Sequence, residues 1–110
     1  MRLPTSARVL VRITLLGCSL LSAAAWSSGE ELMNRSGCIS CHRIDQKLIG
    51  PAFTDVSKRY RGDASVGARL FAKVRAGGEG EWGDVPMQPN GPEKISDEDL
   101  NALLAWILQL

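Results

Sequence analysis

The sequence predicts an all-α fold of about four short helices joined by long loops. Two stretches, 63–76 and 96–108, repeat apolar residues at the spacing of one helix face. No stretch alternates apolar and polar residues as a half-buried strand would. Glycines and prolines cluster between the helical stretches and separate them. Periodicity and the residues that interrupt it therefore determine the predicted fold class.

The first predicted helix covers 28–36 and leads directly into a pair of cysteines. Leu32 and Met33 would be its apolar contacts. Gly37 would end it, because glycine readily adopts the left-handed conformation found after helix ends. The following segment, 43–50, has neither a helical nor a strand period, so we expect a loop there.

Two further helices are predicted in the middle of the chain. Thr54 is expected to cap a short helix that runs to about Tyr60 and stops at Gly62. The next helix is expected over 63–76, and the glycine pair 77–78 would close its C-terminal end.

The last helix has the strongest start signals. Ser96 can cap it, and Asp99 occupies the capping-box position, while Ile95 and Leu100 can form a hydrophobic staple. Its predicted apolar face consists of Leu100, Leu103, Leu104, Ile107 and Leu108. The preceding segment, 77–92, is rich in glycine and proline and is predicted to be an irregular loop. Loops of this length inside compact domains are usually functional.

The pentapeptide Cys-Ile-Ser-Cys-His at 38–42 is typical of a c-type haem attachment site. Cys38 and Cys41 could form thioether bonds with one porphyrin, and His42 could bind its iron. A dithiol redox pair would need a βαβ context, which this sequence lacks. A zinc site normally needs four ligands, whereas His42 is the only histidine and Cys18, the only other cysteine, lies in an apolar leader.

Met87 is the predicted second axial ligand. It lies in the long loop, far enough along the chain from His42 to reach the opposite side of a haem. Pro86 and Pro89 flank it, and their fixed φ angles reduce the entropy lost when the loop is ordered. Ordinary burial is the alternative for Met87, and Met33 is interpreted as a core residue.

Residues 1–25 are predicted to be an export signal, which leaves a single mature domain, 26–110. The leader has a basic start, an apolar segment and small residues before the expected cleavage site. Its apolar run is shorter than the roughly 17 to 25 residues of a spanning helix, so no membrane span is expected in the mature protein. A retained anchor, or a lipoprotein acylated at Cys18, are the alternatives.

The charge balance disfavours nucleic-acid binding. Lys and Arg total 13 and Asp and Glu total 12, and the leader contains three of the arginines but no acidic residue. The mature part is therefore mildly acidic and lacks the basic surface that nucleic-acid binding requires.

These features resemble those of the short bacterial class I cytochromes c, the Pseudomonas-type periplasmic electron carriers. The matching segments are 37–42, 49–53, 55–56, 82–83, 86–90, 96–97 and 106–108. They span nearly the whole mature chain in the right order. The resemblance implies a class I cytochrome c fold around one covalent haem c.

The resemblance also implies the roles of individual residues. The implied axial ligands are His42 and Met87, and the implied cofactor-binding residues are Cys38, Cys41, Pro51, Trp82 and Asn90. The Pro51 carbonyl would accept a hydrogen bond from the His42 ring, Trp82 would donate to a propionate, and Asn90 would bond near the methionine sulfur.

Three positions depart from the family pattern. Lys73 stands where an arginine often approaches a propionate, Gln88 replaces a proline after the ligand, and Met33 replaces an aromatic residue. Lysine is a point charge without the planar fork of arginine, so Lys73 would not reproduce a bidentate contact with a propionate.

The predicted function is that of a monomeric, non-enzymatic electron carrier in the periplasm, which meets its redox partner proteins only transiently. Its docking patch would consist of Ile39, Leu48, Val85, Pro86 and Gln88. One alternative is a subunit tethered to a lipid or a larger complex. Another is a five-coordinate haem enzyme or gas sensor, which the lack of a second histidine disfavours.

Overall fold

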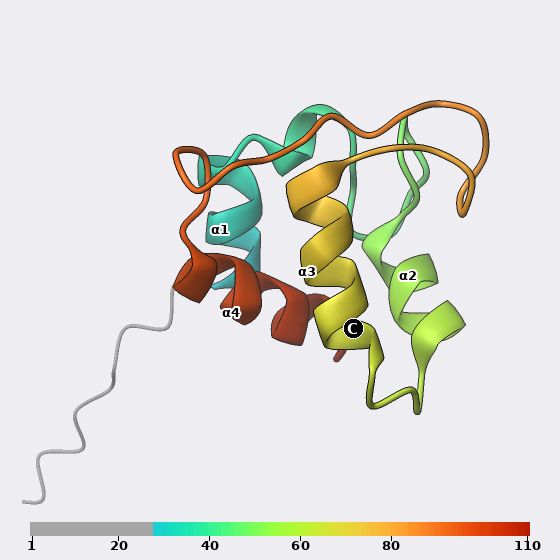
Figure 1. Ribbon diagram of the computed structural model, residues 1–110. Coiled ribbons are helices and arrows are strands. Elements are labelled where there is room, and N and C mark those ends of the chain that lie inside the picture. The colour runs from blue at the N-terminus through green and yellow to red at the C-terminus, as the bar shows by residue number, and fades with distance from the viewer. Residues whose placement is uncertain (1–27) are drawn as a thin grey trace, which may run out of the picture.

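The computed structural model describes residues 28–110 and confirms the all-α fold (Figure 1). The helices are α1 (Gly29–Arg35), α2 (Phe53–Tyr60), α3 (Val66–Ala76) and α4 (Asp97–Ile107), with one turn of 3₁₀ helix, η1 (Cys38–Ser40). Helix α4 contacts each of the other three α-helices. The only strand-like pairing within these residues is an isolated bridge between Gly78 and Met87.

The predicted cap of the last helix is confirmed, and the first helix has a cap of the same kind that was not predicted. The Ser28 hydroxyl accepts from the Glu31 N–H at 3.1 Å, and the Ser96 hydroxyl accepts from the Asp99 N–H at 3.1 Å. Gly37, with φ of 78°, follows the end of α1 in the left-handed conformation. Local sequence therefore determines where both helices begin.

Thr54 does not cap α2, contrary to the prediction. The helix begins at Phe53, two residues before the start that a Thr54 cap would give, and its N-cap residue Ala52 makes no side-chain cap. Backbone carbonyls take over the role of a cap, because Phe53 N–H donates to Arg43 at 3.0 Å and Thr54 N–H donates to Ile44 at 2.9 Å. The loop after the cysteine pair therefore satisfies the donors that a side chain was expected to satisfy.

Helix α3 begins at Val66, three residues later than predicted. The Asp63 carboxylate accepts hydrogen bonds from both the hydroxyl and the backbone N–H of Ser65, at 2.6 and 2.9 Å. These bonds close a turn before the helix starts and lower the pKa of Asp63. At the other end, Gly77 has φ of 68° and its N–H donates to Lys73, as the glycine pair predicted.

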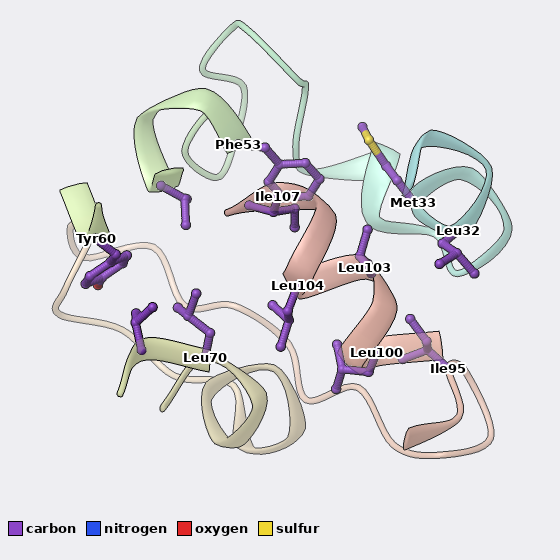
Figure 2. Close-up of a cluster of buried hydrophobic side chains, with 12 residues drawn as sticks. Leu32, Met33, Phe53, Tyr60, Leu70, Ile95, Leu100, Leu103, Leu104 and Ile107 are labelled. Carbon is purple, nitrogen blue, oxygen red and sulfur yellow. The ribbon is translucent and has the colours of Figure 1, made fainter. Parts of the chain in front are cut away.

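The core lies between α4 and the other helices (Figure 2). The apolar face of α4 is buried as predicted, except that Leu108 lies beyond the helix end and is only partly buried. The other buried members of the core are Leu32, Met33, Phe53, Val56, Tyr60, Val66, Leu70 and Ile95. Met33 is 3% exposed, which fits its interpretation as a core residue.

Helices α1 and α4 cross in close contact. A side chain at Gly29 would overlap the ring of Trp106, so only glycine allows this approach. Arg35 and Asp99 add an exposed ion pair at 2.9 Å between the same two helices. The Asp99 carboxylate is thus engaged with Arg35 rather than with the N-cap residue, and only half of the predicted capping box forms.

The far end of α4 is bound to α2. The Ser57 hydroxyl, in a residue only 1% exposed, donates to the carbonyls of Leu108 and Leu110 at 3.3 and 3.1 Å. Among residues 28–110, no helix is long and apolar enough to cross a membrane.

Candidate haem-binding site

The cysteine pair and the histidine lie on one tight turn after α1. Cys41 N–H and His42 N–H both donate to the Cys38 carbonyl, at 3.1 and 2.9 Å. Both thiols are free and partly exposed. Burial raises the pKa of the Cys38 thiol. The spacing of the motif therefore places both cysteines and the histidine on one turn.

Arg43 braces this turn, which the sequence did not indicate. Its guanidinium donates to the carbonyl of His42 at 2.9 Å and also to the carbonyl of Ile39. Two carbonyls of the attachment turn are thereby satisfied by one side chain.

The His42 ring is held on several sides. It is 9% exposed, and its Nδ1 lies 2.9 Å from the Pro51 carbonyl oxygen. Because a carbonyl oxygen only accepts, Nδ1 carries the proton and Nε2 keeps the lone pair that a metal ion binds. The ring stacks on Phe53, with centroids 5.0 Å apart, and a methyl group at Gly50 would overlap it.

His42 and Met87 line the same hollow. Its cavity volume is about 40 Å³, and it opens partly to solvent. Its lining residues are Ser36, Cys38, His42, Phe53, Val74, Met87, Asn90, Ile95, Leu100, Leu103, Leu104 and Ile107. Most of these side chains are apolar, and they come from all parts of the described chain.

Met87 is placed by its backbone. It forms the isolated bridge with Gly78, and its carbonyl lies so close to Gly77 that a side chain there would overlap it. The Asn90 side-chain amide donates to the Gln88 carbonyl at 2.8 Å, next to Met87. The long loop is therefore ordered around the methionine.

Trp82 and Cys41 are not among the residues that line the hollow. The Trp82 ring meets the Tyr60 ring edge-on, with centroids 6.3 Å apart, and the Arg59 guanidinium lies 4.5 Å from its centroid. Arg59 and Tyr60 both bond to Glu81, at 2.5 and 2.9 Å. This cluster fixes Trp82 against α2, and no pattern in the sequence indicated it.

The donor set fits a c-type haem. One imidazole and one thioether face the same mostly apolar hollow, and the two cysteines lie in the turn that also carries the imidazole. An apolar lining is what the porphyrin requires, and nitrogen and sulfur ligands are those used in haem proteins of this kind.

Comparisons with known proteins agree with this chemistry. The family model described as cytochrome c matches residues 27–110. Cytochrome c-551 of Azotobacter vinelandii is 44% identical over 81 residues, which cover 74% of this chain and 95% of that protein. Cytochrome c-551 of Pseudomonas aeruginosa is 38% identical over 91 residues, which cover 82% of this chain and 85% of that protein.

Solved structures show the same fold. The crystal structure of wild-type Nitrosomonas europaea cytochrome c552 has a TM-score of 0.67 and 36% sequence identity, and covers 73% of this chain and 96% of that one. The class 1 cytochrome MtoD of Sideroxydans lithotrophicus has a TM-score of 0.65 at 29% identity, and covers 76% of this chain and 92% of that one. The chain therefore belongs to the cytochrome c family, as an electron-transfer protein of the small class I type that carries one covalently bound haem c.

Proposed function

We propose that this protein is an exported electron carrier whose haem is attached to Cys38 and Cys41, with His42 and Met87 as the two axial ligands. The observation that supports this most strongly is that His42 and Met87 line one hollow. Haem c, when bound, supplies a one-electron couple between ferrous and ferric iron.

The residues around His42 would fix the proximal ligand. The Pro51 carbonyl holds the proton on Nδ1, so Nε2 is the ring nitrogen available to the iron. Phe53 and Gly50 leave the ring little room to rotate. His42 would thus keep one orientation in both oxidation states.

Met87 would occupy the opposite side. Methionine opposite histidine raises the reduction potential in c-type cytochromes. With both axial positions taken by the protein, no position is left for a substrate, which disfavours the five-coordinate enzyme or gas sensor. The described chain also offers no second imidazole for acid–base catalysis.

Two further residues would contact the haem. We assign the Trp82 indole N–H to a propionate, since Arg59 and Tyr60 hold the ring in place. Asn90 would hydrogen-bond near the Met87 sulfur, and it already lines the hollow beside Met87. Lys73 is left out of this set, because its single ammonium lacks the fork of arginine.

The protein would work as a monomer in the periplasm and meet its redox partners transiently. The periplasmic location rests on the leader, residues 1–25, which lies outside the described residues. An intact mass would show whether the mature chain begins at Trp26 or whether Cys18 is acylated. An acylated protein would be the tethered alternative, with the same chemistry at the haem.

The absorption spectrum and the ligand binding of the purified protein test this function. The reduced protein should show a low-spin c-type spectrum that carbon monoxide leaves unchanged, and it should be oxidised and reduced reversibly. These results are expected because both axial positions are filled. Rapid carbon monoxide binding by the unmodified protein would instead favour the five-coordinate alternative.

Partner docking is expected at the apolar patch predicted from the sequence. Ile39, Leu48 and Val85 are 40%, 45% and 64% exposed, and Pro86 and Gln88 are exposed as well. Ile49, which was not part of the predicted patch, is 55% exposed in the same loop as Leu48. A carrier needs a small, weak contact that releases its partner after each electron, and such a patch suits this.

Val85→Glu and Ile39→Lys should slow electron transfer to the physiological partner severalfold, because each places a charge in the apolar contact. Stopped-flow transfer rates would measure this, while spectrum and potential stay nearly unchanged. Glu93→Lys, at an exposed position outside the patch, is the control and should mainly alter the salt dependence of the on-rate. Unchanged transfer rates in both patch variants would show that the partner binds another face.

A further inference from the structure

The segment that carries Met87 is bound to the C-terminal end of α3 at two places. At the first, Gly78 and Met87 exchange two backbone hydrogen bonds, at 2.9 and 3.0 Å. At the second, the Asn90 N–H donates to the Val74 carbonyl at 3.0 Å. Between them, the Asn90 side chain donates to the Gln88 carbonyl at 2.8 Å. The position of Met87 therefore depends on how firmly this segment stays on the end of α3.

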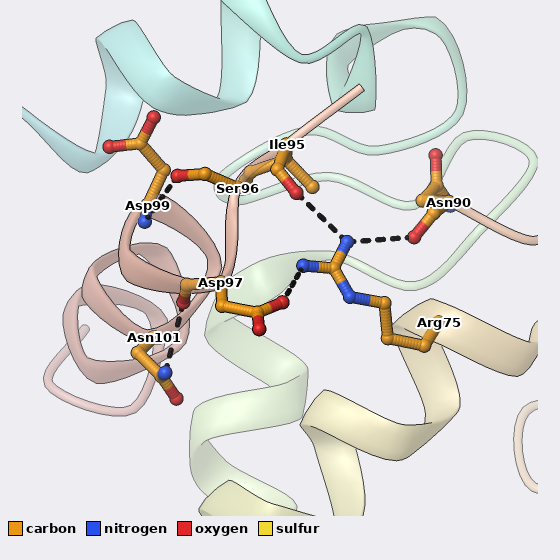
Figure 3. A network of polar contacts seen from close by, with 7 residues as sticks. All are labelled: Arg75, Asn90, Ile95, Ser96, Asp97, Asp99 and Asn101. Carbon is orange, nitrogen blue, oxygen red and sulfur yellow. Dashed lines mark hydrogen bonds and ion pairs between the residues drawn. The ribbon is translucent and has the colours of Figure 1, made fainter. Parts of the chain in front are cut away.

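Arg75, in the last turn of α3, holds the second of these places (Figure 3). Its Nη1 donates to the carbonyls of Asn90 and Ile95, at 3.0 and 2.9 Å, and its Nη2 pairs with Asp97 at 2.5 Å. The Arg75 side chain is only 18% exposed, so its two bonds to carbonyls form partly away from water, whereas the Asp97 side chain is 76% exposed. One guanidinium thus joins α3, the end of the methionine loop and the start of α4.

The two carbonyls that Arg75 binds belong to residues that line the haem hollow, Asn90 and Ile95. The turn between them is closed by its own backbone, because Lys94 and Ile95 both donate to the Gly91 carbonyl, at 3.0 and 3.3 Å. Arg75 is not itself among the lining residues. It fixes both ends of this turn from outside the hollow.

From this geometry we infer that Arg75 is a positioning residue for axial ligation by Met87. It acts through the backbone: by holding Asn90 on the end of α3, it keeps the methionine loop closed and so reduces how often the sulfur leaves the iron. This inference rests on the proposed ligation by Met87. Arg75 has no expected contact with the haem. It would nevertheless affect how firmly Met87 stays bound to the iron.

The chemistry of arginine suits this role. A planar guanidinium presents several donors in fixed directions, whereas a lysine ammonium is a compact point charge. The Phe71 ring lies under the Arg75 guanidinium, 5.1 Å from centroid to Cζ, and orients it. Arg75→Lys would keep the charge but lose the fork and the stacking.

The rate at which imidazole replaces the methionine sulfur in the ferric haem-bearing protein tests the inference. At saturating imidazole this rate reports how often the loop opens. Arg75→Met should raise it about tenfold or more, equivalent to about 1.4 kcal/mol, because charge-assisted hydrogen bonds to the loop are lost. Arg75→Lys should give an intermediate rate, and the near-infrared sulfur-to-iron band of Arg75→Met should weaken.

Two control variants separate positioning from a general loss of stability. Arg35→Met removes an ion pair to the same end of α4, without a bond to the methionine loop. Ser57→Ala removes a buried donor at the far end of α4. Both should leave the imidazole rate within about twofold of the parent, even where denaturant unfolding shows lower stability.

The outcomes distinguish this inference from the ligation on which it rests. If the parent lacks the sulfur-to-iron band, the proposal that Met87 is an axial ligand is wrong. The role of Arg75, which depends on that ligation, is then wrong as well. If the parent has the band and Met87→Ala loses it, but Arg75→Met exchanges imidazole no faster than the two controls, then only the positioning role is overturned.

Discussion

The Met87→Ala variant should lose the weak near-infrared sulfur-to-iron charge-transfer band of the oxidised protein and should bind carbon monoxide readily when reduced. The reason is that alanine offers no ligand, so one axial position opens within a hollow that is already formed. The reduction potential should fall as well, since the methionine sulfur favours the ferrous state. Absorption spectra and a redox titration would measure all three changes.

Met33→Leu is the matched control for this variant. Met33 is buried in the core, and leucine conserves its volume, so the band and the potential should stay as in the parent. Retention of the band in Met87→Ala, together with its loss in Met33→Leu, would show that Met33 is the axial ligand.

Replacement of Cys38 and Cys41 by alanine should abolish covalent haem attachment almost completely and leave a poorly folded chain. The mature domain is short, so its protein core alone supplies only a small margin of stability. Without haem, Leu100, Leu103 and Ile107 would face a hollow that nothing apolar fills. Haem staining after denaturing electrophoresis would measure attachment, and circular dichroism would measure folding.

Ser40→Ala provides the control within the same turn, because Ser40 is exposed and carries neither expected bond. It should mature with haem attached. A double alanine variant that is exported, stably folded and still binds haem covalently would contradict the attachment at Cys38 and Cys41.

The parts of the fold that depend on neighbouring residues could be predicted from the sequence. Ser28 and Ser96 cap their helices through donors three residues away, and Gly37 and Gly77 end helices by their own conformational freedom. The attachment motif is likewise a local pattern. Its turn follows from the spacing of its residues, so the five residues at 38–42 are enough to predict a covalent haem.

The parts that depend on distant residues could not be predicted. Thr54 looked like a cap because the sequence does not show that Arg43 and Ile44 present their carbonyls to the start of α2. Nothing in the sequence marked Arg75 as part of the site, since its three acceptors lie 15 to 22 residues further along the chain. Arg59 likewise meets Glu81 only through the tertiary fold. The supports of the site were therefore harder to find than the expected ligands themselves.

The crossing of α1 and α4 at Gly29 and Trp106 has a topological consequence. This contact joins the first and last helices of the described chain, so it closes a loop of nearly the whole domain, at an entropy cost on the order of 4 kcal/mol. Helix α1 continues directly into the turn that carries Cys38, and α4 supplies Leu100 and its neighbours to the hollow. Closure of the chain therefore also brings the Cys38 turn to the hollow that α4 lines. Contacts of such large sequence separation slow folding, so the helix crossing that positions the Cys38 turn is also one that limits the speed of folding.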